Sequence, residues 1–241
     1  YPDIPGLDTF AGITMHSARW DTSLDLKGKR IGVIGTGSSA AQLIPELINA
    51  PGTDVTVFQR TAQWLVEAKN KPYTDAQKKR FREQPWRMAL VRKLSLWTFE
   101  QGTSALTSDS WWGSKMHALF AWNAKRYINQ SIADPVLRAK LTPDYKFGCK
   151  RVVMNETFYP AIQKPNAHLV TDAIERIEPQ GVVTKDVATR DGKLHELDIL
   201  VLATGFDPAA FMRPMEFRGR DGLSIDDACK EKITAYRSLL V

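Results

Sequence analysis

The segment that most constrains the fold is a short apolar run, Ile31–Ile34, followed directly by Gly35-Thr36-Gly37-Ser38-Ser39-Ala40. An apolar strand that leads into Gly-x-Gly-x-x-Ala and then into a helix is the arrangement that holds a dinucleotide pyrophosphate. Gly35 permits the tight turn, Gly37 lets the backbone approach the phosphates, and the small Ala40 lets helix and strand pack closely. The start of the helix then offers unpaired N–H groups and a partial positive charge to the anion.

The residues after this motif complete a β-α-β unit. Apolar side chains at helical spacing predict a helix from Ser39 to Asn49, Pro51-Gly52 ends it, and a second strand follows at residues 55–58. We therefore predict an α/β, Rossmann-like dinucleotide-binding domain. Its predicted cofactor contacts in this region are Gly35, Thr36, Gly37, Ser38, Ser39, Ala40 and Gln42.

The end of the second strand indicates which nicotinamide cofactor fits. An NAD site places Asp or Glu there to accept hydrogen bonds from the ribose 2′-OH, whereas this chain has Gln59-Arg60-Thr61. A carboxylate would repel a 2′-phosphate, and a guanidinium can pair with it through two parallel hydrogen bonds. The sequence therefore predicts NADP(H), bound through Arg60 and Thr61.

Composition excludes several other classes of protein. The 241 residues are 43% hydrophobic, enough for one large domain or two smaller ones, and no apolar run approaches the length of a membrane span. The N-terminus has no signal pattern, and two cysteines cannot form a disulfide framework or a zinc cluster, so we predict a cytoplasmic protein without a metal site. The net charge of +6 fits a phosphate-rich cofactor, and no aromatic-basic motif indicates nucleic acid as a partner.

The rest of the chain divides into segments of different character. Residues 1–28 are predicted to be an irregular connector, and residues 72–145 a mostly helical insertion within a domain that spans 29–207. Proline and glycine mark the expected breaks in that insertion: Pro72, Pro85, Gly102, Gly113, Pro135 and Pro143. Its apolar side chains recur at helical spacing and predict a core-facing stripe: Trp86, Ala89, Leu90, Leu94, Trp97, Met116, Leu119, Phe120 and Tyr127.

Strand patterns return after residue 146. We predict a strand at 167–170, a hairpin of 181–184 with 193–196, and a buried parallel strand at 198–203 that ends in Thr204-Gly205. The chain has no initiator Met and stops in an apolar run, so both ends are expected to lie inside a longer polypeptide.

Three further motifs resemble one family. Phe10-x-Gly12-x-x-x-His16-x-x-x-Trp20-Asp21 precedes the glycine motif, Phe147-Gly148-Cys149-Lys150-Arg151 follows the insertion, and Ala203-Thr204-Gly205-Phe206-Asp207 ends the last predicted strand. In type and place they are similar to motifs of the class B flavin-dependent monooxygenases, and the first is similar to the fingerprint of the Baeyer–Villiger monooxygenase branch.

The resemblance implies a function for the complete enzyme. NADPH would reduce FAD, and a flavin C4a-peroxide formed with O₂ would convert a ketone to an ester or lactone. It further implies that Lys150 binds the 2′-phosphate, that Arg151 lies over the flavin, and that Ala203-Thr204-Gly205 marks the crossing between the NADP and FAD domains. Arg151 is our candidate catalytic residue, because a guanidinium stays charged at any working pH.

The resemblance also implies roles for the flanking segments. The fingerprint residues Phe10, Gly12, His16, Trp20 and Asp21 would lie at the hinge between domains, and 208–241 would begin a truncated C-terminal part of the FAD domain. Members of the family bind FAD through an earlier Gly-x-Gly-x-x-Gly, and no such motif precedes Gly35 here. The isolated chain is therefore expected to be limited to NADP(H) binding and to be inactive.

Two alternatives stay open. One is a flavin-containing monooxygenase that oxidises the nitrogen or sulfur of amines and sulfides; Trp20-Asp21 favours the Baeyer–Villiger type, because the heteroatom enzymes resemble the fingerprint without that pair. The other is an NADP-binding module with no chemistry of its own.

Overall fold

The structure is a computed structural model that describes residues 1–68, 71–107, 110–185, 192–206, 215–219, 222–231, 235–236 and 239–240. The chain forms two compact units, Tyr1–Thr204 and Gly205–Val241. The second unit contains the helix α7 (Ile225–Ala228) and a strand pair of β11 (Ala235–Tyr236) and β12 (Leu239–Leu240). All predicted site residues except Gly205 lie in the first unit.

A five-stranded parallel sheet forms the centre of the first unit. Its strands are β1 (Ile13–His16), β2 (Arg30–Ile34), β3 (Asp54–Phe58), β6 (Ala167–Val170) and β10 (Ile199–Leu202), in the order β1-β10-β2-β3-β6. From β2 the chain moves outward through β3 to β6, then returns to β10 on the other side of β2. The strand order therefore reverses between β2 and β10, where ligands bind in open α/β sheets, outside the carboxyl ends of the strands. This confirms the predicted Rossmann-like α/β fold.

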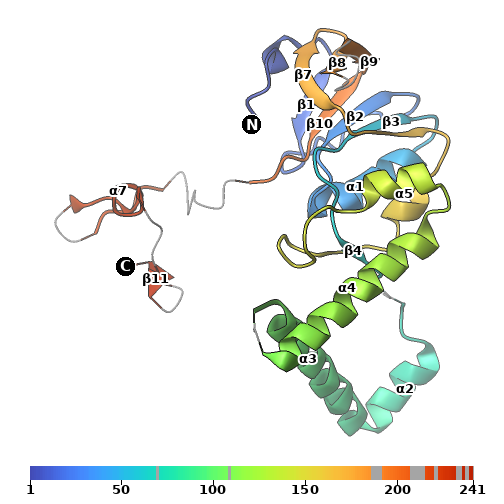
Figure 1. Ribbon diagram of the computed structural model, residues 1–241, viewed down its shortest axis with the longest axis vertical. Coiled ribbons are helices and arrows are strands. Elements are labelled where there is room, and N and C mark those ends of the chain that lie inside the picture. Colours follow the sequence, from blue (N-terminus) through green and yellow to red (C-terminus); the bar gives the residue numbers. More distant parts are fainter. Residues whose placement is uncertain are drawn as a thin grey trace. The chain divides into compact units, whose positions relative to one another are not determined.

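Both faces of this sheet are covered. Helices α1 (Ser38–Asn49) and α6 (Phe158–Ile162) pack on one face, against alternate residues such as Val33 and Val201. The antiparallel strands β7 (Ala173–Glu178), β8 (Gly181–Lys185) and β9 (Gly192–Glu196) cover the other, against Phe58 and Leu200 among others. Figure 1 shows the sheet between these three strands and helix α1. Burial on both faces explains why β10 is apolar at every position.

The first 28 residues are more regular than predicted. Besides the 3-10 turn η1 (Leu7–Thr9), they contain β1, which pairs with β10 from Ile13–Ile199 to His16–Leu202. The expectation of an irregular connector is thus wrong for residues 13–16. This strand has four residues at a sheet edge and buries one side chain, Met15. Its sequence therefore lacks the alternation of apolar and polar residues that indicates a strand.

The insertion between β3 and β6 is mostly helical, as predicted. Its elements are β4 (Leu65–Val66), α2 (Asp75–Glu83), α3 (Pro85–Thr107), α4 (Trp111–Ser131), α5 (Pro135–Leu141) and β5 (Val153–Met154), and β4 pairs with β5. Pro85 and Pro135 begin helices, where the missing N–H has no cost. Gly102 and Gly113 lie inside α3 and α4, so the predicted breaks at these two residues are wrong.

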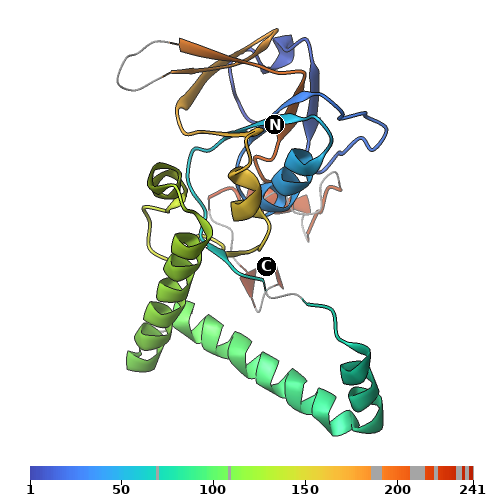
Figure 2. The same ribbon diagram turned by 90° about the vertical axis from the view of Figure 1, so that its right-hand side faces the viewer.

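The apolar side chains of α3 are exposed. Trp86, Leu94 and Trp97 are 56–59% exposed, and Leu90 is 48% exposed. Helices α2 and α4 contact α3, and Figure 2 shows α3 apart from the sheet. The predicted core-facing stripe is therefore wrong for α3.

Over the described part of the chain, no helix is apolar enough along a sufficient length to cross a membrane.

The stripe of α4 is only partly buried. Phe120 and Tyr127 pack against core residues as predicted, whereas Leu119 is 51% exposed. The buried positions of α4 are Gly113, Ala124 and Ile128.

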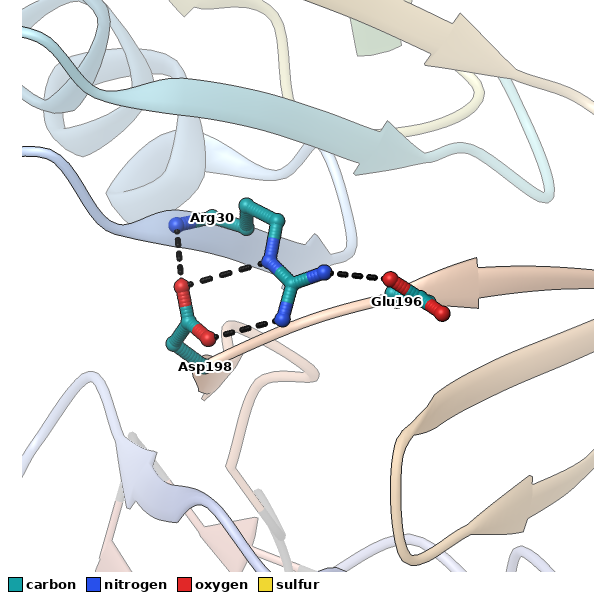
Figure 3. A network of polar contacts seen from close by, with 3 residues as sticks. All are labelled: Arg30, Glu196 and Asp198. Atoms are coloured by element: carbon teal, nitrogen blue, oxygen red, sulfur yellow. Dashed lines mark hydrogen bonds and ion pairs between the residues drawn. The ribbon is translucent and has the colours of Figure 1, made fainter.

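A charged network fastens the start of β2 to the end of β9 and to the residue before β10 (Figure 3). The Arg30 guanidinium donates to Asp198 Oδ1 at 2.9 Å and to Glu196 Oε2 at 2.5 Å, while the Arg30 backbone N–H donates to Asp198 Oδ2 at 2.8 Å. The hydrogen bonds that the Arg30 side chain and backbone donate to Asp198 lower the pKa of that carboxyl group. The contacts of Arg30 with Glu196 and Asp198 join residues that are 166 and 168 positions apart in the sequence, and they hold the start of β10 beside the start of β2.

Candidate functional site

Four chain segments meet at the carboxyl edge of the parallel sheet. The turn at Gly35–Gly37 follows β2, Gln59–Thr61 follows β3, Thr171 follows β6, and Ala203-Thr204 follows β10. Parallel pairing carries these segments to one edge although more than 100 residues separate the first from the last two. The predicted cofactor residues of the first unit are thereby distributed along one side of the domain.

Gly35 lies where β2, β3 and β10 end together. Its φ of +108° is a conformation that side chains disfavour, and its N–H donates to the Phe58 carbonyl at 3.0 Å. A Cβ at this position would lie 2.5 Å from the Ala203 carbonyl oxygen. Glycine is thus required here both by conformation and by the close approach of the Ala203-Thr204 segment.

Gly37 is glycine for a different reason. Its φ of −69° suits any residue, but a Cβ there would have no atom within 4 Å. Gly37 is the N-cap of α1, no side chain caps the helix, and its first turn carries no acidic residue. The N–H groups of Ser38, Ser39 and Ala40 have no acceptor within the helix because they belong to its first turn. These residues fit a pyrophosphate, which needs backbone donors and room for close approach.

The side chains around this turn have distinct roles. The Thr36 hydroxyl donates to the Thr61 carbonyl at 3.1 Å, so it joins the glycine turn to the segment after β3. Ala40 is fully buried against the sheet, in keeping with close helix–strand packing. Ser39 and Gln42 are exposed on α1, and Ser38 is half-buried.

A cavity of about 510 Å³ opens beside the end of β3. Three cationic side chains line it: Arg60 after β3, Lys140 in the last turn of α5, and Lys150 before β5. Among the residues that the structure describes, no ion pair joins any of the three to a carboxylate. The other lining residues are Gln59, Thr61, Ala62, Thr142, Asp144, Tyr145 and Thr171. The cavity is therefore suited to an anion.

Lys150 and Tyr145 form one wall of this cavity. The Lys150 Nζ lies 4.7 Å from the centroid of the Tyr145 ring, within the range of a cation–π interaction. The Trp64 indole donates to the Tyr145 carbonyl at 3.0 Å, and the Tyr145 hydroxyl donates to Gln63 Oε1 at 3.2 Å. Because the backbone and the hydroxyl of Tyr145 are both held, the ring provides a fixed platform for the Lys150 ammonium. Burial raises the pKa of Tyr145, so the phenol stays neutral.

Gln59 faces the protein interior. Its side chain is buried, and its Nε2 donates to the Lys140 carbonyl at 2.7 Å. This bond joins the end of β3 to the last turn of α5 and sets Lys140 beside Arg60. No local pattern in the sequence indicates Lys140, because it lies 80 positions after Arg60 and belongs to a short helix without a motif.

Arg151 is exposed and lies two residues before β5. The structure does not bring it into the cavity that Lys150 lines. Its predicted position over a flavin stays a prediction.

The fingerprint residues Phe10 and Gly12 fasten β1 to the sheet. Phe10 is buried with Leu200 and Leu202, and a Cβ on Gly12 would lie 2.5 Å from the Asp198 carbonyl oxygen. The tight contact at Gly12 therefore lies next to the Arg30–Asp198 network described above.

The remaining fingerprint residues lie at and beyond the carboxyl end of β1. His16 ends the strand, and its Nδ1 accepts from the Ala18 N–H at 3.2 Å. Trp20 is half-buried against the core under α1. The Asp21 carboxylate accepts from the backbone and hydroxyl of Ser23 at 2.9 and 2.6 Å, which lowers its pKa. These contacts order the loop after β1, and the predicted hinge role stays a prediction.

The Ala-Thr-Gly motif falls at the division between the two units. Ala203 and Thr204 end the first unit, and Gly205, with a φ of +93°, begins the second. Asp207, the last residue of this motif, lies outside the described residues.

Comparison with known proteins identifies relatives across the whole chain. The model of the flavin-binding monooxygenase-like family matches residues 2–236. An uncharacterized monooxygenase of Mycobacterium tuberculosis is 42% identical over 240 residues, which are 100% of this chain and 46% of that protein. A Baeyer–Villiger monooxygenase of Streptomyces coelicolor is 37% identical over 98% of this chain and 44% of its own length.

Solved structures show the same architecture. The open crystal structure of cyclohexanone monooxygenase matches with a TM-score of 0.76 and 31% identity, over 98% of this chain and 52% of that one. A structure of OTEMO in complex with FAD and NADP matches with a TM-score of 0.76 and 28% identity, over 98% and 51%. The chain thus spans about half the length of the relatives it matches. The match of the family model over residues 2–236 shows that this chain belongs to the flavin-binding monooxygenase-like family.

Proposed function

We propose that the intact protein is an NADPH- and FAD-dependent monooxygenase of the Baeyer–Villiger type, which uses O₂ to convert a ketone to an ester or lactone. In this proposal the chain supplies the NADP(H) site. The observation that carries it is the presence of open space at Gly37, at the start of α1, together with a cationic cavity at the end of β3. The Baeyer–Villiger monooxygenases among its relatives support the reaction type.

The two halves of the proposed site bind different parts of the cofactor. The backbone N–H groups of Ser38, Ser39 and Ala40 hold the pyrophosphate, with Gly35 and Gly37 giving it access. Arg60 and Lys150 hold the 2′-phosphate, beside Thr61. A guanidinium forms two parallel hydrogen bonds with a phosphate, and the ammonium adds a point charge.

The chain's own residues also have a proposed part in the chemistry. When bound, FAD supplies the oxygen activation and NADPH the reducing equivalents. Arg151 places a fixed positive charge where negative charge develops on oxygen, and a preorganised cation of this kind lowers the barrier. His16 and Trp20 hold the hinge segment that lets the cofactor domains move. Ala203-Thr204-Gly205 carries the chain toward the FAD domain.

The NADP(H) assignment is tested by titrating the 241-residue chain with NADPH and with NADH. Arg60→Ala should weaken NADPH by roughly 1.5–3 kcal/mol, the contribution of a hydrogen bond to a charged group, and leave NADH unchanged. That loss corresponds to about 10- to 150-fold in Kd. Arg80→Ala removes an exposed arginine of α2 and should change neither affinity. Equal losses for both cofactors with Arg60→Ala would exclude this residue from the 2′-phosphate site.

The proposed hinge is tested in the intact protein, by measuring the rate at which NADPH reduces its flavin. His16→Ala should slow that reduction, because the loop after β1 would lose the hydrogen bond between His16 Nδ1 and the Ala18 N–H. An unchanged reduction rate would refute the hinge role.

A second candidate function is oxygenation of nitrogen or sulfur in amines and sulfides. Trp20-Asp21 at the end of the fingerprint favours the Baeyer–Villiger type. Product analysis on the intact protein separates the two, with a cyclic or aryl ketone in one reaction and a tertiary amine in the other. Formation of an N-oxide without any ester or lactone would favour the second candidate.

The third alternative applies to the isolated chain, which we propose binds NADP(H) without chemistry. The purified 241-residue chain should bind NADPH, carry no flavin colour and consume no O₂. Stoichiometric FAD in that preparation would contradict the proposal.

A further inference from the structure

We propose that Lys140 is a third cation of the 2′-phosphate site and a specificity-determining residue for NADPH over NADH. The inference rests on the proposed function, since it concerns the same cavity. It adds a residue from α5, an element that none of the sequence motifs includes.

The first support is position. Lys140 lines the cavity together with Arg60 and Lys150. The hydrogen bond from Gln59 Nε2 to the Lys140 carbonyl, 2.7 Å long and largely buried, fixes the backbone of Lys140 next to the residue that precedes Arg60. A cation held in this way does not depend on a flexible loop for its place at the cavity.

The second support is charge. Three cations from separate segments face one cavity of about 510 Å³, and Asp144 brings one carboxylate to its lining. Like charges that share a site repel each other, and a bound dianion relieves that repulsion. A phosphate monoester carries about −1.5 to −2 charge near pH 7, which matches the excess of two positive charges in the lining.

Lys140 has a simpler structural role with which this proposal must be compared. A lysine in the last turn of a helix interacts favourably with the negative end of the helix dipole, and Lys140 is in the last turn of α5. That role affects the stability of the chain and would affect both cofactors alike. Only a contact with the 2′-phosphate changes the preference between them.

The test is calorimetric titration of the 241-residue chain with NADPH and NADH, and with adenosine 2′,5′-bisphosphate and AMP as smaller probes. Lys140→Gln should raise the Kd for NADPH and for the bisphosphate by about 3- to 10-fold, as expected for a charged contact from an exposed side chain. The Kd for NADH and for AMP should not change. Lys140→Arg should keep the preference for the phosphorylated ligands, because it keeps the charge.

The matched control is Lys27→Gln, an exposed lysine in the loop before β2, at the opposite edge of the sheet. It should leave all four affinities unchanged. Thermal melts of both variants check that the fold is intact, and we expect this because both side chains are exposed.

The outcomes separate this inference from the function on which it rests. If the unmodified chain binds NADPH no more tightly than NADH, the proposed NADP(H) site is refuted, and the role of Lys140 with it. If the chain prefers NADPH and Arg60→Ala abolishes the preference, but Lys140→Gln retains it, the inference about Lys140 alone is overturned. Equal weakening of NADPH and NADH by Lys140→Gln would also overturn it, because it would show a structural role.

Discussion

The two glycines of the turn after β2 should respond to alanine in opposite ways. At Gly35 a Cβ would lie 2.5 Å from the Ala203 carbonyl oxygen in a residue with a φ of +108°. At Gly37 a Cβ would have no atom within 4 Å, in a residue with an ordinary φ of −69°. Gly35→Ala should therefore destabilise the fold, whereas Gly37→Ala should leave the fold intact and interfere with the cofactor.

The magnitudes follow from these geometries. At Gly35 the backbone strain costs about 1–3 kcal/mol, and the forced displacement of Ala203, just after β10, costs a similar amount. Since 1 kcal/mol lowers the Tm of a chain of this size by about 2–4 °C, we expect a loss on the order of 10 °C. At Gly37 two small effects oppose each other. Alanine is a poorer N-cap than glycine by roughly 1 kcal/mol or less, but it restricts the unfolded chain by about 0.4–1 kcal/mol.

The assay combines thermal melts with NADPH and NADH titrations of both variants. Gly37→Ala should keep the Tm within a few degrees and weaken NADPH and NADH by the same factor, because both share the pyrophosphate. One lost hydrogen bond to a charged group, about 1.5–3 kcal/mol, predicts about a 10- to 150-fold weaker affinity. If Gly37→Ala binds NADPH as tightly as the unmodified chain, the pyrophosphate does not lie against the start of α1. A Gly35→Ala variant with an unchanged Tm would refute the packing argument.

Three further predictions concern burial, the cavity wall and pH. Leu94→Ala should change the free energy of unfolding by less than about 0.5 kcal/mol because Leu94 is 56% exposed, whereas Leu47→Ala should cost about 2–5 kcal/mol because Leu47 is 2% exposed. Chemical denaturation measures both free energies, and equal losses would contradict the exposed position of Leu94. Tyr145→Phe should keep the preference for NADPH over NADH because it keeps the ring under Lys150, whereas Tyr145→Leu should reduce that preference. NADPH and NADH titrations measure it, and an equal preference in both variants would exclude the cation–π platform. The pKa of Asp198 is lowered in the folded chain, so its contribution to stability is present above the ordinary carboxyl pKa of about 4 and is lost as pH falls through the folded value. Asp198→Asn should therefore flatten the acid side of the stability–pH curve, and an unchanged curve would show that another group governs it.

The elements that could be predicted are those with strong local signals. The sequence predicts the helix from Ser39 to Asn49 and strands at 55–58 and 167–170, and the structure has Ser38–Asn49, Asp54–Phe58 and Ala167–Val170. Each of these three elements is marked by residues that are close together in the sequence: apolar residues at helical spacing or in a short run, with turn residues beside them. The strands that were not predicted lack such signals: β7 buries one side chain of six, and β4 and β5 have two residues each.

Helix α3 shows a different limit of sequence reasoning. Spacing correctly predicts a helix around Trp86–Trp97, but spacing alone does not indicate whether another element covers the apolar side chains. The apolar residues of α3 occur all round the helix, so no single face is marked for the core, and most of them are exposed. Burial depends on partners elsewhere in the chain, which a local pattern does not contain.

The residues of the candidate site likewise differ in whether a local motif in the sequence indicates them. The glycine turn and Arg60 could be predicted because each belongs to a motif whose residues are neighbours in the sequence. Lys140 and Tyr145 could not, since they reach the cavity only through the crossover between β3 and β6. For the same reason Thr36 could be placed near the cofactor, but its hydrogen bond to the Thr61 carbonyl could not be foreseen.

We expect the proposed preference for a phosphorylated cofactor to depend on the packing of the domain as well as on its charges. At the end of β3, where an NAD site places a carboxylate, Gln59 turns inward and donates to the Lys140 carbonyl at 2.7 Å. A glutamate at this position would place a carboxylate oxygen against the Lys140 carbonyl oxygen. Both oxygens are hydrogen-bond acceptors, and no proton would lie between them in this buried site. The repulsion would cost several kcal/mol of stability or would separate α5 from β3. If the proposed site is correct, a change of cofactor requires more than exchanging Arg60. The Gln59 amide that takes the place of a carboxylate beside the proposed 2′-phosphate site also holds α5, and with it Lys140, against the end of β3 that precedes Arg60.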